Sequence, residues 1–478
     1  MKKGILAPIS SLPSPYGIGT FGKTAFLFCD FLASTNQDSW QILPLSVTSY
    51  GDSPYQSPSA YAINPYFIDL DILVENGYIN SEDIVDVDLS YDKIDYERLY
   101  YTRRNILKKA SKKVDTGVDY CNFLRENSEW IDDYALFMSI KELNAGAPWY
   151  KWDDGLKRKD KSAIKDFVSK NEELITYYKI EQYLAFSQWS ALKNYANQKG
   201  IEIIGDMPIY NAYDSHDVWG EPHYYQLDER LDPIAVAGVP PDAFTSDGQL
   251  WGNPLYNFDK MSEDGYRFWV KKLRHQAKLF DTVRIDHFRA FEAYFSIPYG
   301  KKPKAGKWVK APGEEIFNII KDEVDVNIIA EDLGIITPAV RRLLKKCKFP
   351  NMRVMQFANF SNPKHEYLPQ NYPKNCIAYT GTHDNDTTKA WYNSLSESDR
   401  EKVKKYATDQ VVVFGLIKKL MKSKADRVIV PIQDYLLQGG EGRINYPGKD
   451  TGNWTYRIPK GVFEDRFFIR TVKELSVR

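Results

Sequence analysis

Short apolar runs that alternate with helical segments limit the possible folds of this chain more than any other feature. The runs are rich in valine and isoleucine, and polar residues follow several of them. Such alternation is typical of parallel strands that are connected by helices. We expect strands at residues 39–45, 61–70, 202–208, 281–286, 327–332, 352–357, 376–384 and 427–433. About eight such strands predict an α/β fold, a (β/α)8 TIM barrel with helical and loop insertions between the strands.

Two long stretches differ from the rest of the chain. Residues 75–180 are charged and helical in period, and they predict a mainly helical insertion subdomain with solvated helix faces. Residues 210–257 are irregular, and because long loops in compact domains are usually functional, they predict a functional region. No linker divides the chain, so we expect residues 1–478 to form a single catalytic domain. Further helices are expected at residues 23–34, 180–199 and 265–279.

The composition excludes several kinds of partner. Lys plus Arg and Asp plus Glu number 64 each, so the net charge is zero and no basic field attracts nucleic acid. No run of roughly 18 apolar residues predicts a membrane span. The four cysteines lack C-x-x-C spacing and no signal peptide is recognisable, so we expect reduced thiols and a cytoplasmic location. Aromatic residues make up 14% of the chain, and although most fill the core, such rings also suit sugar ligands.

Three carboxylates each close an expected strand: Asp286, Glu331 and Asp384. The carboxyl ends of barrel strands meet in one bowl, so these side chains are expected to converge. Glycoside cleavage needs a carboxylate that attacks the anomeric carbon and a carboxylic acid that protonates the leaving oxygen. Arg284 shares a strand face with Asp286, and its charge is expected to keep Asp286 ionised. The apolar residues before Glu331 are expected to raise its pKa and keep it protonated.

The same residues allow two other interpretations. Arg284 and Asp286 can form a structural ion pair at a strand end. His287 and residues 383–386 supply ligand types for a metal-assisted hydrolase. Against a metal site, the chain has six histidines and no H-x-H or H-E-x-x-H pattern. It also lacks a G-x-G-x-x-G fingerprint and a Walker loop, so we expect neither a metal nor a cofactor.

Nine segments, in order along the chain, carry a resemblance to a known family. They are residues 11–19, 40–45, 53–60, 205–210, 236–254, 284–292, 330–334, 379–388 and 452–457. On these segments the chain resembles the 4-α-glucanotransferases, also called amylomaltases or disproportionating enzymes, which are relatives of the α-amylase clan. Residues 236–254 and 379–388 are long and unusual, and they make the resemblance specific.

The resemblance implies roles for individual residues. By matching motif, Asp286 is the expected nucleophile, Glu331 the general acid/base and Asp384 the stabiliser of the transition state. The expected sugar contacts are Tyr55, Asp206, Arg284, His383, Phe244, Gln249, Trp251 and Asn453. The implied reaction is a retaining double displacement that transfers α-1,4-glucan segments between maltooligosaccharides, with the aromatic loop at residues 244–251 excluding water.

Some positions depart from the commoner family pattern, and they leave acceptor preference and product size open. These positions are Asn211, His216, Ala290 and Tyr456. Two other functions also stay open. A plain α-glucan hydrolase would use the same carboxylates, and a catalytically silent glucan-binding protein would bind the same sugars.

Overall fold

Eight parallel strands form the centre of the molecule, as the sequence predicts. The computed structural model describes residues 1–85, 92–241, 247–449 and 451–477. Neighbouring strands pair in the order β10-β11-β12-β1-β2-β3-β6-β9. The ring closes where the backbone N–H of Ala330, in β9, donates to the carbonyl of Pro350 before β10, at 3.1 Å. The strands are β1 (Lys2–Leu6), β2 (Ser39–Gln41), β3 (Glu202–Met207), β6 (Thr282–Ile285), β9 (Asn327–Ala330), β10 (Asn351–Val354), β11 (Cys376–Tyr379) and β12 (Arg427–Pro431).

The prediction of a strand at residues 61–70 is wrong, and the strand β1 was not predicted. Residues 61–70 instead include the short helical turn η3 (Pro65–Phe67) and the start of α2 (Leu70–Glu75). Asn64 caps η3 and Asp69 caps α2, each by accepting a hydrogen bond from a backbone N–H of the following turn. These caps favour helical turns over an extended strand, although the segment contains many β-forming residues.

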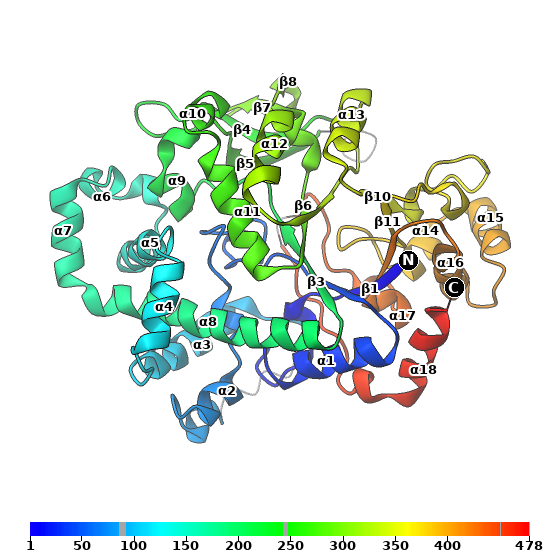
Figure 1. The fold of residues 1–478 in the computed structure, drawn as a ribbon, viewed down its shortest axis with the longest axis horizontal. Coiled ribbons are helices and arrows are strands. Elements are labelled where there is room, and N and C mark those ends of the chain that lie inside the picture. Colours follow the sequence, from blue (N-terminus) through cyan, green and yellow to red (C-terminus); the bar gives the residue numbers. More distant parts are fainter. Residues whose placement is uncertain (86–91, 242–246, 450, 478) are drawn as a thin grey trace.

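The insertion between β2 and β3 is built from helices that lie together on one side of the barrel (cyan in Figure 1). The longest of them, α8, packs against α1 (Lys23–Ser34) and α5 and leads into β3. The helices after α2 are α3 (Tyr96–Ser111), α4 (Val118–Glu126), α5 (Ile131–Leu143), α6 (Asp154–Lys157), α7 (Lys161–Lys170) and α8 (Glu172–Gln198).

A second, antiparallel sheet takes two of its four strands, β4 and β5, from the region that the sequence indicated as irregular (green, top of Figure 1). Its strands pair in the order β5-β4-β7-β8. They are β4 (Ala235–Val239), β5 (Gln249–Pro254), β7 (Ala293–Pro298) and β8 (Lys307–Lys310). The sheet therefore joins the long connection after β3 to the one after β6. The helix α9 (His216–Gly220) precedes β4, and α10 (Phe258–Glu263) and α11 (Arg267–Leu279) lie between β5 and β7.

The remaining helices complete the outer layer of the barrel. The last one, α18, packs against α1 and α16, so the two chain ends lie near each other (Figure 1). These helices are α12 (Gly313–Glu323), α13 (Pro338–Cys347), α14 (Thr388–Ser394), α15 (Glu397–Ala407), α16 (Val412–Met421), α17 (Ile432–Tyr435) and α18 (Arg466–Leu475). Within the described ranges, no helix has the length and apolar character that crossing a membrane requires.

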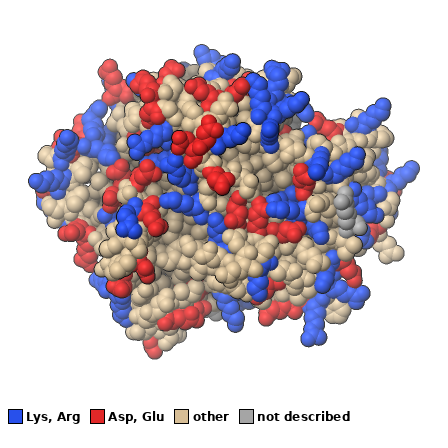
Figure 2. Space-filling model, in the orientation of Figure 1, with Lys and Arg blue, Asp and Glu red and all other residues tan. Residues whose placement is uncertain are grey.

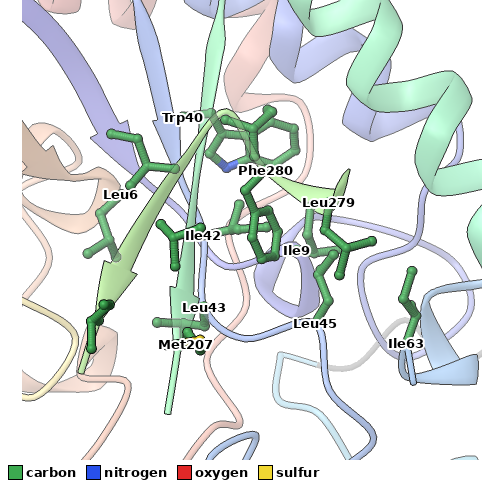
Figure 3. Packing of buried hydrophobic residues seen from close by; sticks show 14 of the residues in the cluster. Leu6, Ile9, Trp40, Ile42, Leu43, Leu45, Ile63, Met207, Leu279 and Phe280 are labelled. Carbon is green, nitrogen blue, oxygen red and sulfur yellow. The ribbon is translucent and has the colours of Figure 1, made fainter. Parts of the chain in front are cut away.

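Close packing between the strands and the helices that cover them fixes β3 beside β6. Figure 3 draws Trp40 and Phe280 among the buried side chains of this core, and the Phe280 ring packs against Trp189 of α8, with the two centres 6.1 Å apart. A Cβ atom at Gly205, in β3, would lie only 2.1 Å from the Phe280 ring, so no larger residue fits there. The resulting register places Asp206 of β3 directly beside Arg284 of β6. The core thus sets the position of two side chains at the carboxyl end of the barrel.

Candidate active site at the carboxyl end of the barrel

Arg284 organises the floor of the candidate site. Its side chain is 2% exposed, and its guanidinium reaches two carboxylates at once. One terminal nitrogen, Nη1, donates to both oxygens of Asp206, at 2.7 and 2.5 Å. The other, Nη2, donates to Oδ1 of Asp286 at 3.0 Å. Because side chains alternate along a strand, Arg284 and Asp286 point the same way, as the sequence predicts.

Tyr55 and His383 complete this floor from two distant loops. The Tyr55 hydroxyl donates to Oδ2 of Asp206 at 2.7 Å and lies 2.8 Å from Nε2 of His383. The two rings stack with their centres 5.5 Å apart. Four of the expected sugar-binding residues therefore form one connected group, although they come from four separate parts of the sequence.

Glu331 follows β9 directly, and backbone amides hold both of its oxygens. Oε2 accepts from the N–H of His287 at 2.8 Å, and Oε1 accepts from the N–H of Leu333 at 2.6 Å. His287 has a φ of 51°, and this left-handed conformation is part of the tight turn that presents its N–H to Glu331. Burial raises the pKa of Glu331, while Arg284 and the two amides oppose that rise. The predicted direction agrees with this result.

The pKa of Asp286 is raised, and the expectation that Arg284 keeps it low is wrong. Burial is the largest cause, and the negative charges of Asp206, Glu331 and Asp384 add to it. Arg284 works in the opposite direction, but it divides its charge between Asp286 and Asp206. One shared cation does not outweigh burial together with three neighbouring carboxylates.

Asp384 lies in the loop after β11 and not at the end of that strand, because β11 ends at Tyr379. Its side chain is 42% exposed, and its Oδ2 lies 3.4 Å from Nε2 of His383. The Nδ2 group of Asn445 donates to Oδ1 of Asp384 at 2.7 Å. Arg443 donates to the backbone carbonyl of Asp384 at 3.2 Å. A loop close to the C-terminus thus fixes the third carboxylate.

Neither Asn445 nor Arg443 is predicted from the sequence as a site residue. Both lie in the polar, turn-rich segment 438–449, and its place after the last strand is the one local signal that it borders the bowl. No periodicity or motif within that segment indicates that its side chains reach back to residue 384.

Trp251, on β5, borders the candidate site from the second sheet. Its ring packs edge-on against the ring of His287, with the two centres 4.8 Å apart. Its indole N–H donates to Oε1 of Gln249 at 3.0 Å, so two of the expected substrate contacts are bonded to each other. The second sheet therefore places an aromatic side chain beside the residue that follows Asp286.

Comparison with known proteins identifies the family. The model of a family described as 4-alpha-glucanotransferase matches residues 7–462. This chain belongs to the 4-α-glucanotransferase family. It is 44% identical to the 4-alpha-glucanotransferase of Clostridium butyricum over 95% of this chain and 96% of that protein. It is 42% identical to the enzyme of the same name from Thermus thermophilus, over 96% of this chain and 95% of that one.

A solved structure agrees with this assignment. The amylomaltase from Streptococcus agalactiae, in complex with acarbose, has a TM-score of 0.96 and 38% sequence identity to this chain. The match covers 100% of this chain and 98% of that one. This chain is accordingly a 4-α-glucanotransferase on a (β/α)8 barrel.

One of the expected sugar contacts of this glucanotransferase, Phe244, lies outside the described residues. The side chain of Asn453 is buried, and it bonds to its own loop: Oδ1 accepts from the N–H of Tyr446 at 2.9 Å, and Nδ2 donates to the carbonyl of Lys449 at 2.8 Å. Asn453 therefore organises the turn that follows Asn445.

The metal-site alternative gains no geometric support from the residues that the structure describes. Among them, no group of three or more His, Cys, Asp or Glu side chains is arranged to hold a metal ion. His383 instead contacts Tyr55 and Asp384, and Asp386 pairs with Arg443 at 3.4 Å. These groups serve the floor and the loop of the glucanotransferase site.

Proposed function

We propose that this 4-α-glucanotransferase acts by a retaining double displacement on α-1,4-glucans, with maltooligosaccharides as donors and acceptors. The observation that carries the proposal is the different support of two neighbouring carboxyl groups. Asp286 contacts the guanidinium of Arg284, whereas Glu331 contacts two uncharged backbone amides. Burial raises the pKa of both groups, but a cation in direct contact favours the ionised form, so we assign the negative charge of the pair to Asp286 and the proton to Glu331. Asp286 is accordingly the nucleophile and Glu331 the acid.

In the first half-reaction, a carboxylate oxygen of Asp286 attacks the anomeric carbon of the donor glucan. The bond from that carbon to the glycosidic oxygen breaks, and Glu331 transfers its proton to the departing oxygen. In the second half-reaction, the 4-hydroxyl of an acceptor glucan attacks the covalent glycosyl-enzyme. Glu331, now a carboxylate, takes the hydroxyl proton, and Asp286 is released as the anion.

The other residues of the floor bind the reacting sugar in this mechanism. Asp384 stabilises the positive charge that develops on the sugar ring, and Asn445 holds the carboxylate of Asp384 in place. Tyr55, Asp206, Arg284 and His383 surround the sugar at the point of cleavage. We assign the cover of the bound glucan to Gln249, Trp251 and Phe244, which limits the access of water, and a further glucan contact to Asn453.

A neutral glucan suits the surface of the protein. On the face shown in Figure 2, Lys and Arg side chains are interspersed with Asp and Glu side chains, so a neutral chain meets no field of one sign. The similar amylomaltase from Streptococcus agalactiae was solved with acarbose, which supports a glucan ligand here.

The organisation and location of the protein belong to the same proposal. Residues 1–478 act as one catalytic domain, with residues 75–180 as a helical insertion and residues 210–257 as the covering region. All four cysteines are free thiols, which supports a reducing, cytoplasmic location.

The test is to incubate the purified protein with maltotriose alone and to resolve the products by size. Transfer yields glucose and a ladder of longer maltooligosaccharides at constant total reducing ends. Glucose and maltose with rising reducing ends would mean hydrolysis on the same scaffold, and no change would favour a silent glucan-binding protein. In the same assay we expect Asp286→Asn to lose at least about a thousandfold in kcat. Unchanged activity of that variant would refute the mechanism.

A further inference from the structure

A buried lysine lies under the segment that leaves the barrel after β3. Lys272, on α11, is 2% exposed. Its Nζ atom donates to the backbone carbonyls of Pro208 and Ile209, at 2.9 and 3.1 Å, and to Oδ1 of Asn211, at 2.9 Å. All three acceptors belong to residues 208–211, directly downstream of Asp206. One side chain therefore fixes the whole segment.

The contacts of Lys272 fit its charged form. An ammonium group has three N–H donors, which matches the three acceptors, whereas a neutral amine has two. The ring of Trp269 lies 5.4 Å from Nζ, and its π face attracts a cation. Burial lowers the pKa of Lys272 to about 7, and the charge of Asp217 opposes this effect. When Lys272 is protonated, the segment is held by charge-assisted hydrogen bonds, which are stronger than neutral ones.

From this segment, hydrogen bonds continue to both walls of the candidate site. The backbone carbonyl of Asn211 accepts from Nδ2 of Asn253 at 3.0 Å. Oδ1 of Asn253 accepts from Nε2 of Gln56 at 3.0 Å, and the same nitrogen lies 3.3 Å from the carbonyl of Trp251. Gln56 follows Tyr55 in the chain. The contacts therefore connect Lys272 with the loop that carries Tyr55 and with the strand that carries Trp251.

We propose that Lys272 is a positioning residue for glycosyl transfer. It fixes residues 208–211, and through Asn253 and Gln56 this segment aligns Tyr55 with Trp251 around the sugar. The inference rests on the proposed function, because that function assigns sugar contacts to Tyr55 and Trp251. A displacement of about 1 Å in such groups lowers catalysis up to about a hundredfold, since reacting groups must be held near their reactive geometry.

The test compares two lysines of the same helix. Lys272→Met removes the ammonium group and keeps an unbranched apolar stem. Lys278→Met is the matched control, because Lys278 is exposed. It donates to the carbonyl of Glu126 at 3.1 Å, and Glu126 belongs to the helical insertion and not to the site. With maltotriose, we expect kcat of Lys272→Met to fall at least tenfold with a smaller change in KM. The control is expected to stay within twofold of the wild type.

A double-mutant cycle separates positioning from plain structural support. Lys272 and Gln56 share no direct contact, so independent effects on kcat would multiply. If the connected hydrogen bonds act as a unit, Lys272→Met and Gln56→Ala together lower kcat little more than Lys272→Met alone. If Lys272→Met does not fold, the cycle of Asn211→Ala with Gln56→Ala takes its place, because Asn211→Ala keeps the two carbonyl acceptors of Lys272.

Two outcomes would overturn the inference. One is a folded Lys272→Met protein, with its melting temperature above the assay temperature, whose kcat lies within twofold of the wild type. The other is a cycle in which the effects on kcat multiply. A wild-type protein without transfer activity would instead refute the proposed function itself. The two failures are therefore distinguishable.

Discussion

Glu202 joins four strands at the amino end of the barrel, opposite the candidate site. It lies on β3 and accepts hydrogen bonds from Arg427 of β12 at 2.7 Å, from Lys2 of β1 at 2.6 Å and from the hydroxyl of Thr282 on β6. Contacts at the amino end of a barrel stabilise the fold, whereas the chemistry takes place at the other end. We predict that Glu202→Gln destabilises the fold and leaves kcat unchanged.

The size of the effect follows from the charge state of Glu202. Burial alone would raise its pKa, but the contacts with Arg427, Lys2 and Thr282 outweigh burial and lower the pKa from 4.5 to about 2. One pKa unit corresponds to about 1.4 kcal/mol. The ionised form of Glu202 therefore stabilises the fold by about 3 kcal/mol relative to the protonated form. Unfolding entropy of roughly 2 cal/mol/K per residue converts this into a melting temperature lower by about 3 °C.

The pH dependence has a definite sign. The folded pKa is lowered, so the stabilisation is complete above the unfolded pKa of about 4.5 and is lost as the pH falls toward about 2. The difference between wild type and Glu202→Gln should therefore be constant from pH 7 to 5 and shrink in more acidic solution. The side chain of Lys2 is 57% exposed, so Lys2→Met is a control that costs at most about 1 kcal/mol.

The assay is thermal unfolding of wild type, Glu202→Gln and Lys2→Met across this pH range, with kcat measured on maltotriose in parallel. Equal melting temperatures of wild type and Glu202→Gln at pH 7 would refute the estimate of stabilisation. A tenfold fall in kcat of the folded variant would refute the separation between the stabilising end of the barrel and the reactive end.

Three further predictions concern the site. Trp251→Ala is expected to raise KM for maltotriose several-fold, because an aromatic face contributes about 1 kcal/mol; an unchanged KM in initial-rate measurements would contradict the contact. Asn445→Ala is expected to lower kcat about tenfold, because Asp384 loses an amide donor worth roughly 1.5 kcal/mol; a wild-type kcat in the folded variant would exclude that role. Burial and neighbouring charges, Asp206 among them, raise the pKa of Asp286, so Asp206→Asn should move the acid limb of the kcat/KM profile to lower pH. A shift to higher pH would contradict this sign.

The barrel was predictable from the sequence, but its exact strands were not. Alternation of apolar runs with helices indicates the (β/α)8 fold because each buried strand leaves a local pattern. The strand at Lys2–Leu6 was missed, since its two lysines look like a polar start; one of them pairs with Glu202, about two hundred residues away. The second sheet was missed for a similar reason. The first four residues of its strand β5 alternate between partly exposed and exposed, and only pairing with β4 makes the segment a strand.

The same distinction between local and distant causes explains which features of the candidate site could be predicted from the sequence. Asp286 and Glu331 follow their strands directly, so the strand pattern places them in the bowl without knowledge of any contact. Asp384 follows its strand only after a loop, and the residue that holds its carboxylate, Asn445, comes from another loop. The pKa of Asp286 is raised by burial in the closed barrel and by carboxylates from other strands and loops, against the charge of Arg284. A sequence therefore indicates which groups reach the bowl, while their charge and orientation are set by partners that meet only after the barrel closes.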